Sequence, residues 1–359
     1  MTRNQKYSLF IEDLQHIGHS LATHINLYEK KSIFLVGCTA FMGKWLIDAL
    51  LWLNEQYALQ LNLTVLTRNR NTLLSEMPHL QNHDCIRFLD GGIMDFDADA
   101  LPPFELAIHG LNLPNDGTSS WAARHMTTAT QGTERLYRLA AERGCKTVLM
   151  TSSGAVYGTG PVGGTMDGRL CEENAPPNPF SEPRVYGETK RFLESYASAL
   201  GEQYHITTVV ARCFAFSGAH VTLGVNALGS FVADALAGRN IVIKGDGTPV
   251  RSFLYGADMA AWLLVLLVAG RHATPYNVGS RHGVNLKQLA KTILHCAGLD
   301  KDVVVEGTPL QGNAPACYVP AIARIEHELE LKEGYSLEDG LYRMLEWHNM
   351  RQTSSRRLK

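Results

Sequence analysis

The sequence predicts an α/β fold: a doubly wound parallel sheet with a smaller mixed α/β lobe at its C-terminal end. Short apolar runs alternate with helical patterns from residue 32 to residue 212, which is typical of repeated strand–helix–strand units. These runs are largely apolar along their whole length, as expected for parallel strands buried on both faces. Right-handed crossovers leave few topologies for such a chain, and the doubly wound sheet is the commonest of them.

Each element has its own signal along the chain. The run Ser32–Val36 ends at a glycine and predicts a strand, and a helix with one apolar face is expected from Gly43 to about Asn54. Residues 159–185 are rich in glycine, proline and acidic side chains, which is typical of a surface loop or lid. The other expected elements are strands at 61–67, 85–89, 106–109, 147–151, 207–212 and 241–244, and helices at 131–143, 185–201 and 258–268.

Length and pattern divide the chain into three parts. A chain of 359 residues is long enough for about two domains. Residues 1–30 predict a polar, partly amphipathic helical extension, and residues 31–212 contain the strand–helix alternation. Residues 213–359 predict an interleaved lobe, some of whose segments return to the main sheet.

Composition and charge exclude several classes of protein. Hydrophobic residues make up 45% of the chain, which excludes a mainly disordered protein. A net charge of -2 gives no general attraction to nucleic acid or to an anionic membrane, so neither is an expected partner. The N-terminus resembles no secretory signal, and the longest apolar run, Met259–Gly270, is too short to span a bilayer. The seven scattered cysteines form no CxxC pair, which indicates a reducing, cytoplasmic compartment.

A glycine-rich turn joins the first expected strand to the first expected helix. In such a turn, backbone N–H groups and the helix N-terminus can bind a pyrophosphate. Gly37 permits the tight turn, and Gly43 lets the helix pack closely against the strand. The alternative is an ordinary tight turn with no ligand. The residues of this turn expected to bind a dinucleotide are Gly37, Thr39, Ala40, Phe41, Met42 and Gly43.

Two arginines, Arg68 and Arg70, follow the second expected strand. An acidic residue there would bind the ribose hydroxyls of NAD, whereas an arginine can bind the 2'-phosphate of NADP. The expected cofactor is therefore NADP or NAD, with Arg68 favouring NADP. The alternative is that both arginines are solvated loop residues.

Tyr186 and Lys190 stand four residues apart on an expected helix, a spacing that puts both side chains on one face. An ammonium beside a phenol favours the phenolate, so Lys190 is expected to lower the pKa of Tyr186 from about 10. Such a phenol can take or return the proton of a sugar or alcohol hydroxyl. Ser153 ends a strand at the edge where ligands bind in these sheets, so it is expected to hydrogen-bond the same reacting oxygen. By itself, Ser153 is more typical of a satisfied strand-end hydroxyl.

Together and in this order, the glycine turn, the serine segment and the Tyr/Lys pair resemble the extended short-chain dehydrogenase/reductase superfamily, in its nucleotide-sugar epimerase/dehydratase branch. The resemblance covers roughly residues 30–350 and implies a Rossmann-type NAD(P) domain with a nucleotide-sugar lobe. Later segments that agree with it are Ala211-Arg212-Cys213-Phe214, the stretch from Gly245-Asp246-Gly247 through Arg251 to Asp258, and Tyr276-Asn277-Val278-Gly279.

The resemblance implies roles for particular residues. Tyr186 is the acid/base that takes a proton from a sugar hydroxyl, usually at C4, and Lys190 tunes it and anchors the ribose. Ser153 polarises the sugar oxygen. The remaining implied contacts are Gly110 and Thr151 with the cofactor, Arg251 with the diphosphate of the substrate, and Asn226 and Tyr318 around its nucleotide.

The sequence departs from the family pattern where proton transfer would be decided. Dehydratases of this branch carry an Asp-Glu pair just after the Ser/Thr, and decarboxylases keep the Glu, but this chain has Gly154 and Ala155. Neither side chain can transfer a proton. Milder departures are Ala40 in place of a glycine, Gly92 in place of an Asp that contacts adenine, Ala129 in place of an Asn, and no diphosphate-binding arginine near Gln311.

The implied function is NAD(P)-dependent modification of a nucleotide-activated sugar through a 4-keto intermediate, by epimerisation or keto-reduction. These reactions need only Ser153, Tyr186, Lys190 and the cofactor. One alternative is a dehydratase or decarboxylase with non-standard acid and base residues. Others are a catalytically weak NAD(P)-binding sensor or scaffold, and reduction of a carbonyl that is not part of a sugar. Arg251 and the long C-terminal lobe favour a diphosphate-bearing substrate.

Two further expectations concern assembly and metal. Family members often dimerise through two helices each, so a homodimer with a four-helix bundle is expected, built from helices at about 120–143 and 185–201. His16 and His19 share a face of the first helix and could bind zinc, but no Cys or carboxylate cluster completes a site, so no metal is expected. Cys38 in the turn is expected to be a small filler, the alternative being a reactive thiol.

Overall fold

The computed structural model describes residues 7–112, 117–118, 120–158, 165–166, 169–170, 185–308 and 316–357. Most of the expected lid at 159–185 therefore lies outside the described residues, and so does Gln311. Within that stretch, β6 (Thr165–Met166) and β7 (Arg169–Leu170) form an antiparallel pair.

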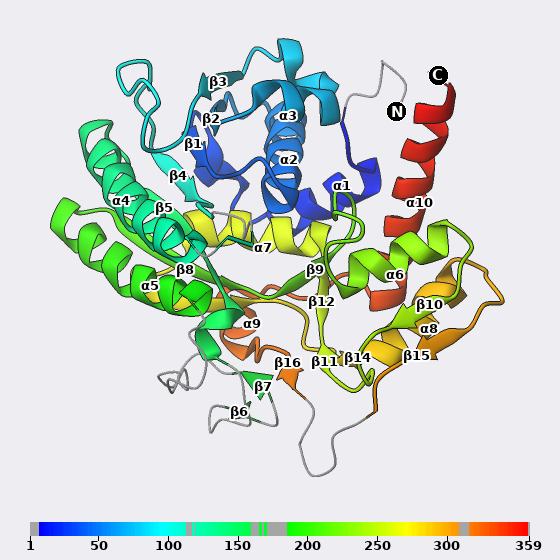
Figure 1. The fold of residues 1–359 in the computed structure, drawn as a ribbon. Helices are drawn as coiled ribbons and strands as arrows, with labels where there is room; N and C mark the ends of the chain where they lie inside the picture. The colour runs from blue at the N-terminus through cyan, green and yellow to red at the C-terminus, as the bar shows by residue number, and fades with distance from the viewer. Residues whose placement is uncertain are drawn as a thin grey trace.

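A parallel sheet of seven strands forms the centre of the molecule, in the order β13-β8-β5-β4-β1-β2-β3 (Figure 1). The strand order reverses beside β1, with β2 on one side and β4 on the other. In such sheets ligands bind beyond the carboxyl ends of the strands at this reversal. The doubly wound α/β prediction is therefore confirmed. The strands are β1 (Ser32–Val36), β2 (Asn62–Thr67), β3 (Ile86–Asp90), β4 (Leu106–His109), β5 (Thr147–Ser153), β8 (Thr207–Cys213) and β13 (Thr274–Val278).

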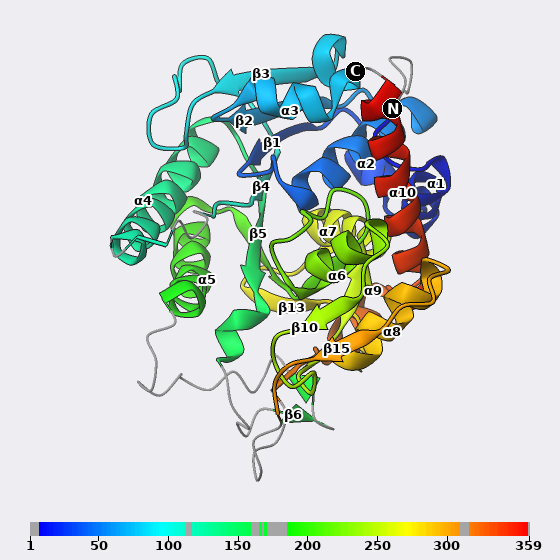
Figure 2. The same cartoon turned by 45° about the vertical axis from the view of Figure 1, so that its right-hand side comes forward.

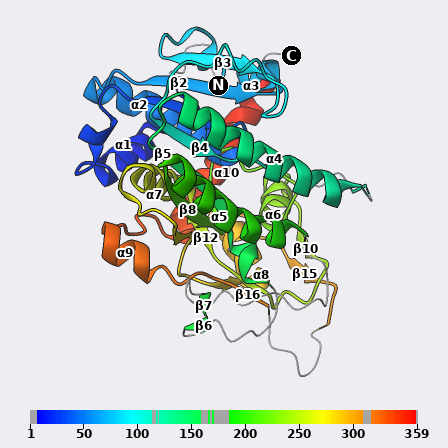
Figure 3. The same cartoon turned by 90° about the vertical axis from the view of Figure 1, so that its left-hand side faces the viewer.

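Helices cover both faces of this sheet (Figure 3). α4 (Trp121–Glu142) and α5 (Val185–Tyr204) pack together on one face, and the other face is covered by α1 (Ile11–Ser20), α2 (Phe41–Tyr57) and α7 (Gly256–Ala269). In β1, Ile33 and Leu35 enter one apolar core, whereas Phe34 and Val36 enter the other. Successive side chains of a strand point to opposite faces, so an unbroken apolar run is what a doubly covered strand requires.

The helix expected at 131–143 begins earlier, near the start of the longer helix expected at about 120–143 for the dimer bundle. α4 starts at Trp121 rather than at Gln131, and its buried stripe continues through His125 and Ala129. The buried face of α4 packs closely against α5 and therefore carries small and polar residues. These residues interrupt the apolar periodicity by which a helix is predicted from sequence.

The C-terminal lobe gathers at one end of the sheet, and α10 (Leu337–Arg357) runs from it along the side of the molecule (Figure 2). Its apolar core joins α6 (Ala227–Leu236), α8 (Leu286–Cys296) and one face of α10. Both α7 and β13 return from this part of the chain to the main sheet. The remaining elements are α3 (Arg70–Glu76), β9 (Ala215–Ser217), β10 (Ile241–Ile243), β11 (Val250–Arg251), β12 (Phe253–Tyr255), β14 (Val284–Asn285), β15 (Val303–Val305), β16 (Cys317–Tyr318) and α9 (Ala323–Leu329), with short 3-10 helices at Ile25–Tyr28, Pro78–Asn82 and Gly154–Tyr157.

The N-terminal helix packs as part of the main core. Asp13 is fully buried and accepts hydrogen bonds from the Tyr255 hydroxyl at 2.7 Å and the Tyr335 hydroxyl at 3.0 Å. His16 Nε2 lies 2.7 Å from a carboxylate oxygen of Asp258. That carboxylate also accepts hydrogen bonds from backbone N–H groups in the loop before α10. His16 therefore has a structural role as the hydrogen-bond partner of the buried Asp258 carboxylate. The described residues contain no group of three His, Cys, Asp or Glu side chains placed to hold a metal ion. No described helix is both long and apolar enough to cross a membrane.

Candidate active site

The glycine turn after β1 has a backbone that excludes side chains at its two ends. Gly37 has a φ of +71°, and a Cβ there would overlap the backbone of Gly110 at the end of β4. A Cβ at Gly43 would overlap the carbonyl group of Cys38. Ala40, by contrast, has a φ of -99°, which explains why this departure from the family pattern is tolerated. These approaches leave a cradle of backbone N–H groups at the N-terminus of α2, which suits a pyrophosphate.

A cavity of about 500 Å³ opens beside this turn, between the carboxyl ends of β1, β2, β3 and β4. Its volume lies in the range of small-molecule sites. Of the residues expected to bind a dinucleotide, those that line it are Gly37, Thr39, Ala40, Met42, Gly43, Arg68 and Gly110. Phe41 is not among them, because its ring stacks on Phe216 at 6.1 Å and lies 6.4 Å from Trp45.

The two arginines after β2 have different surroundings. Arg68 is exposed and lines the cavity, as its expected role requires. Arg70 instead stacks over Phe88 at 4.8 Å, with Asp90 at 3.9 Å. Near Arg68, the Gly92 N–H donates to the carboxylate of Asp95 at 2.6 Å. Asp95 also lines the cavity and so supplies a carboxylate beside Gly92, which has no side chain. In the sequence, Asp95 follows the third expected strand by six residues.

Lys190 is buried on α5 and points toward the ends of β4 and β5. Its Nζ donates to the carbonyl oxygens of Thr151 at 2.9 Å and Leu111 at 3.3 Å, and Leu111 also lines the cavity. Burial lowers the pKa of Lys190 to about 8, against the opposing influence of Cys213 and Glu194. Two of the three N–H donors of the ammonium are used by described residues.

Three hydroxyl groups meet beside this lysine. The Ser153 side chain lies close enough to the phenols of Tyr186 and Tyr318 to lower the pKa of each, and its Oγ accepts the Ala155 N–H at 3.1 Å. Lys190 Nζ lies 6.0 Å from the centroid of the Tyr186 ring. The structure thus brings together Ser153, Tyr186 and Lys190, as the sequence spacing indicated.

The electrostatics of Tyr186 differ from the expectation. Burial raises the pKa of Tyr186 above its ordinary value, and the hydrogen bond from Ser153 offsets this only in part. The prediction that Lys190 lowers the pKa of Tyr186 was wrong for the chain by itself. Desolvation of the phenolate outweighs the effect of an ammonium that is turned toward backbone carbonyls.

Cys38 in the glycine turn is also buried, and burial raises the pKa of its thiol to about 12. This supports the interpretation of Cys38 as a small filler over that of a reactive thiol.

A buried ion pair supports the site from behind. Arg212 on β8 donates from Nη2 to Glu194 on α5 at 2.8 Å, and the Ser152 hydroxyl donates to the same carboxylate at 2.5 Å. Arg212 also donates to the Tyr157 hydroxyl at 3.1 Å. Because these partners come from α5, β5 and β8, the network fixes α5 relative to the strand that ends in Ser153.

The substrate-side residues fall into two groups. β16 pairs with β11 so that Tyr318 lies opposite Arg251, and the Arg251 guanidinium carbon is 5.8 Å from the Tyr318 ring centroid. Tyr318 thereby links Arg251 to Ser153. Asn226 instead caps α6, its side-chain oxygen accepting the Gly229 N–H at 2.9 Å.

Gly154 has no side chain, and residues from other parts of the chain fill the space beside it. A Cβ there would lie 2.6 Å from the Tyr318 hydroxyl oxygen and 2.8 Å from the Phe214 ring. The Tyr318 phenol therefore fills the space that a side chain at 154 would need. Sequence reasoning placed Tyr318 near the nucleotide and missed this contact, because 154 and 318 are far apart in the sequence and meet only in the folded chain.

With this geometry established, comparison with known proteins decides the family. The model of the NAD dependent epimerase/dehydratase family matches residues 33–279, which is more than half of the chain. The chain belongs to this family. Its matched segment contains the glycine turn, the Ser153 segment and the Tyr186/Lys190 pair.

Curated relatives of this family member are distant. UDP-glucuronic acid decarboxylase 1 of Arabidopsis thaliana is 28% identical over 222 residues, or 61% of this chain and 48% of the plant protein. The chain thus matches about half the length of that relative. The low-salt glycan biosynthesis protein Agl12 of Haloferax volcanii is 27% identical over 285 residues, covering 76% of this chain and 84% of that protein.

Solved structures show the same fold. UDP-glucose 4-epimerase of Thermotoga maritima, solved with UDP-glucose, superposes with a TM-score of 0.74 at 22% identity and covers 89% of this chain and 99% of its own. WbmF of Bordetella bronchiseptica, solved with NADH, superposes with a TM-score of 0.74 at 20% identity and covers 92% of this chain and 95% of its own.

Proposed function

We propose that this chain modifies a nucleotide-activated sugar through a 4-keto intermediate, by epimerisation or keto-reduction, with NADP or NAD as cofactor. The observation that carries the proposal is the meeting of the Ser153, Tyr186 and Tyr318 hydroxyls beside Lys190. This group is joined to the dinucleotide cavity by Leu111 on one side and to Arg251 on the other.

The residues of the glycine turn fit the pyrophosphate of a dinucleotide, because Gly37 and Gly43 have no room for a Cβ and so leave backbone N–H groups accessible. When bound, the nicotinamide supplies the hydride chemistry. Arg68 at the cavity wall favours a cofactor with a 2'-phosphate. The third N–H of the Lys190 ammonium has no acceptor among the described residues and suits a ribose hydroxyl.

We assign proton transfer to the Tyr186 phenol. Because burial keeps its pKa raised, the phenol is a proton donor near pH 7, which suits protonation of a keto oxygen. Ser153 is expected to hydrogen-bond the same oxygen, since its side chain lies close enough to the Tyr186 phenol to lower its pKa. Keto-reduction uses this direction of transfer, and epimerisation uses it in its second half.

The Gly154 contact argues against dehydration and decarboxylation. A carboxylate at position 154, as in the resembling dehydratases, would collide with Tyr318 and Phe214 as they stand. Ala155 has no proton to transfer either. The Tyr318 phenol therefore stands where the Asp-Glu pair of a dehydratase would begin. Burial raises the pKa of Tyr318, so this phenol is neutral.

A homodimer remains part of the proposal. α4 and α5 lie side by side, and each exposes a large apolar side chain, Met126 and Phe192. Phe192 stacks on Tyr196 at 5.4 Å, which extends this surface along α5. Two such helix pairs would form a four-helix bundle, and light scattering of the intact chain would give twice the monomer mass.

The test is a two-stage experiment. Thermal shift with UDP-, dTDP-, CDP- and GDP-sugars in the presence of NADP or NAD should show stabilisation by one nucleotide class. Mass spectrometry of the product then separates isomerisation from gain of two hydrogens and from loss of water. Stabilisation by NADP or NAD alone, with no turnover of any sugar, would favour a cofactor-binding sensor instead.

Tyr186→Phe supplies the matched control for this experiment. It removes one hydroxyl, so turnover should fall by about two orders of magnitude or more. Cofactor affinity should stay nearly unchanged, because Tyr186 is not part of the cavity wall. Unchanged turnover in this variant would refute the assignment of the acid/base.

A further inference from the structure

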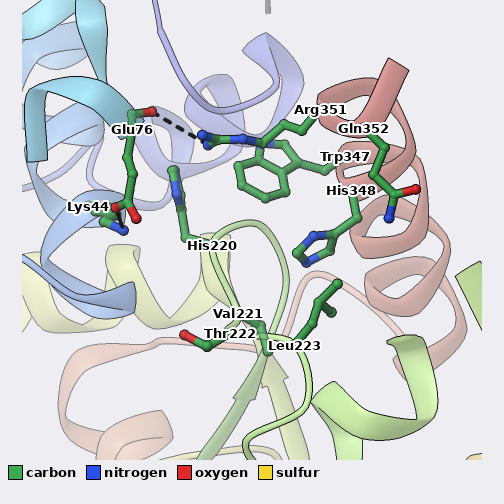
Figure 4. A pocket seen from close by; sticks show the side chains of 10 residues that line it. All are labelled: Lys44, Glu76, His220, Val221, Thr222, Leu223, Trp347, His348, Arg351 and Gln352. Atoms are coloured by element: carbon green, nitrogen blue, oxygen red, sulfur yellow. Dashed lines mark hydrogen bonds and ion pairs between the residues drawn. The ribbon is translucent and has the colours of Figure 1, made fainter. Parts of the chain in front are cut away.

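A second cavity, of about 520 Å³, lies between α2, the end of α3, residues 220–223 and α10 (Figure 4). It shares no lining residue with the cofactor cavity. Lys44 and Glu76 enter it from one side, Trp347 and Arg351 from the other, and His220 between them. A cavity of this size accommodates a small organic molecule.

The wall of this cavity carries more positive than negative charge. Lys44 forms an ion pair with Glu76, and Arg351 donates to the Glu76 backbone carbonyl at 3.5 Å. Among the described residues, Glu76 is the one carboxylate that lines the cavity, and it is already paired. Burial lowers the pKa of Arg351, and Glu76 offsets this only in part. The Arg351 charge is thus incompletely compensated by the protein.

Two histidines complete the polar wall. His348 is 9% exposed, and its Nε2 is buried with no hydrogen-bond partner among the described residues. Burial lowers the pKa of His348 to about 4, and Arg351 adds to the effect. Burial also lowers the pKa of His220, helped by Lys44 and Arg351. Both imidazoles are therefore neutral near pH 7 and lie in a positive field that an anion would cancel.

Hydrogen bonds hold this wall in place. Ser8 Oγ lies 2.8 Å from His220 Nε2 and 2.5 Å from a carboxylate oxygen of Asp48, so the N-terminal segment fixes the imidazole. Trp347 donates from its indole N–H to the Ser8 carbonyl at 2.8 Å, and Arg351 stacks over the Trp347 ring at 4.8 Å. Preformed donors lose little entropy when they bind a ligand.

We propose that this cavity binds the phosphate group of a small phosphorylated molecule, with Arg351, Lys44 and His348 as its ligands. A guanidinium forms two parallel hydrogen bonds to a phosphate, and an ammonium adds a point charge. His348 supplies a ring nitrogen that has no other described partner. The volume beyond one phosphate accommodates the organic part of the molecule.

The experiment is isothermal titration calorimetry of the intact chain with inorganic phosphate and with glucose 6-phosphate, in saturating NAD. NAD occupies the glycine turn, so that phosphate cannot bind there. Both probes should bind, and Arg351→Gln should weaken them by about tenfold or more. Arg239→Gln is the matched control: it makes the same charge change at an exposed arginine that lines neither cavity, and it should leave both affinities unchanged. Arg251→Gln, at the expected diphosphate site, shows whether the probes bind there instead.

A second variant protects the test against misfolding. His348→Phe keeps an aromatic ring and removes the unpartnered nitrogen, so it should weaken both probes without lowering the unfolding midpoint. The proposal is overturned if wild type binds neither probe, if Arg351→Gln and His348→Phe bind as wild type does, or if affinity is lost in Arg251→Gln instead.

Discussion

The two halves of the candidate active site are built by different means. On the cofactor side, one unbroken segment, the turn from Gly37 to Gly43, sets the geometry through backbone contacts with β4. On the substrate side, Ser153, Tyr186 and Tyr318 come from β5, α5 and β16 and meet only because distant strands and helices pack. In the turn, a side chain at Gly37 or Gly43 would overlap backbone atoms, so these two positions tolerate almost no substitution. In the assembled group, a hydroxyl from one part of the chain can take the place of a hydroxyl from another part.

Gly43→Ala should have the largest effect on the cofactor half. The added Cβ would overlap the Cys38 carbonyl, so the turn must open, with a loss of about 3 kcal/mol of stability and of most cofactor affinity. Thermal unfolding and NAD titration measure both. Ala40→Gly, in the same turn, is the control and should cost less than about 1 kcal/mol, because Ala40 has an ordinary φ. Equal effects would show that the turn is not constrained as described.

Gly154→Ala should have the next largest effect, on the substrate half. The new methyl would displace the Tyr318 phenol and the Phe214 ring, and turnover should fall by about tenfold while cofactor affinity is retained. Tyr318→Phe should lower turnover similarly. If position 154 acts through Tyr318, the double variant will be little worse than either single variant. Independent, additive losses would contradict the coupling.

Lys190 links the two halves, and its protonation can be followed by pH. Its folded pKa of about 8 lies below the ordinary lysine value of 10.5, so the unfolded chain binds more protons between these values. The buried ammonium therefore costs stability below about pH 8, and the cost disappears as pH rises toward 10.5. Compared with Lys190→Met by chemical denaturation, wild type should gain stability over this window. A constant difference from pH 7 to pH 10 would contradict the assignment.

Arg68→Ala should have the smallest effect, confined to one cofactor. NADP affinity should fall by about tenfold and NAD affinity much less, because only NADP offers a phosphate to this side chain. Arg70→Ala is the matched control, since Arg70 stacks on Phe88 and does not line the cavity. Titration of each variant with both cofactors gives the answer, and equal losses for NADP and NAD would remove the preference.

The linear pattern of residues is enough to predict the sheet and the cofactor turn. Apolar runs such as Ser32–Val36 can be buried only between two layers, and the glycines at 37 and 43 occupy positions where any side chain would overlap backbone. The Tyr186/Lys190 pair could also be predicted, because residues four apart on one helix lie on the same face. These are short-range constraints that a linear pattern carries.

How the site is completed depends on the packing of the whole folded chain. The direction of the Tyr186 pKa depends on how much water the folded chain excludes, and spacing cannot report that. The close approach of the Tyr318 phenol to Gly154 joins residues that are far apart in the chain. The cavity at Arg351 likewise exists because α10 lies across α2 and residues 220–223. Desolvation and long-range packing depend on the whole fold.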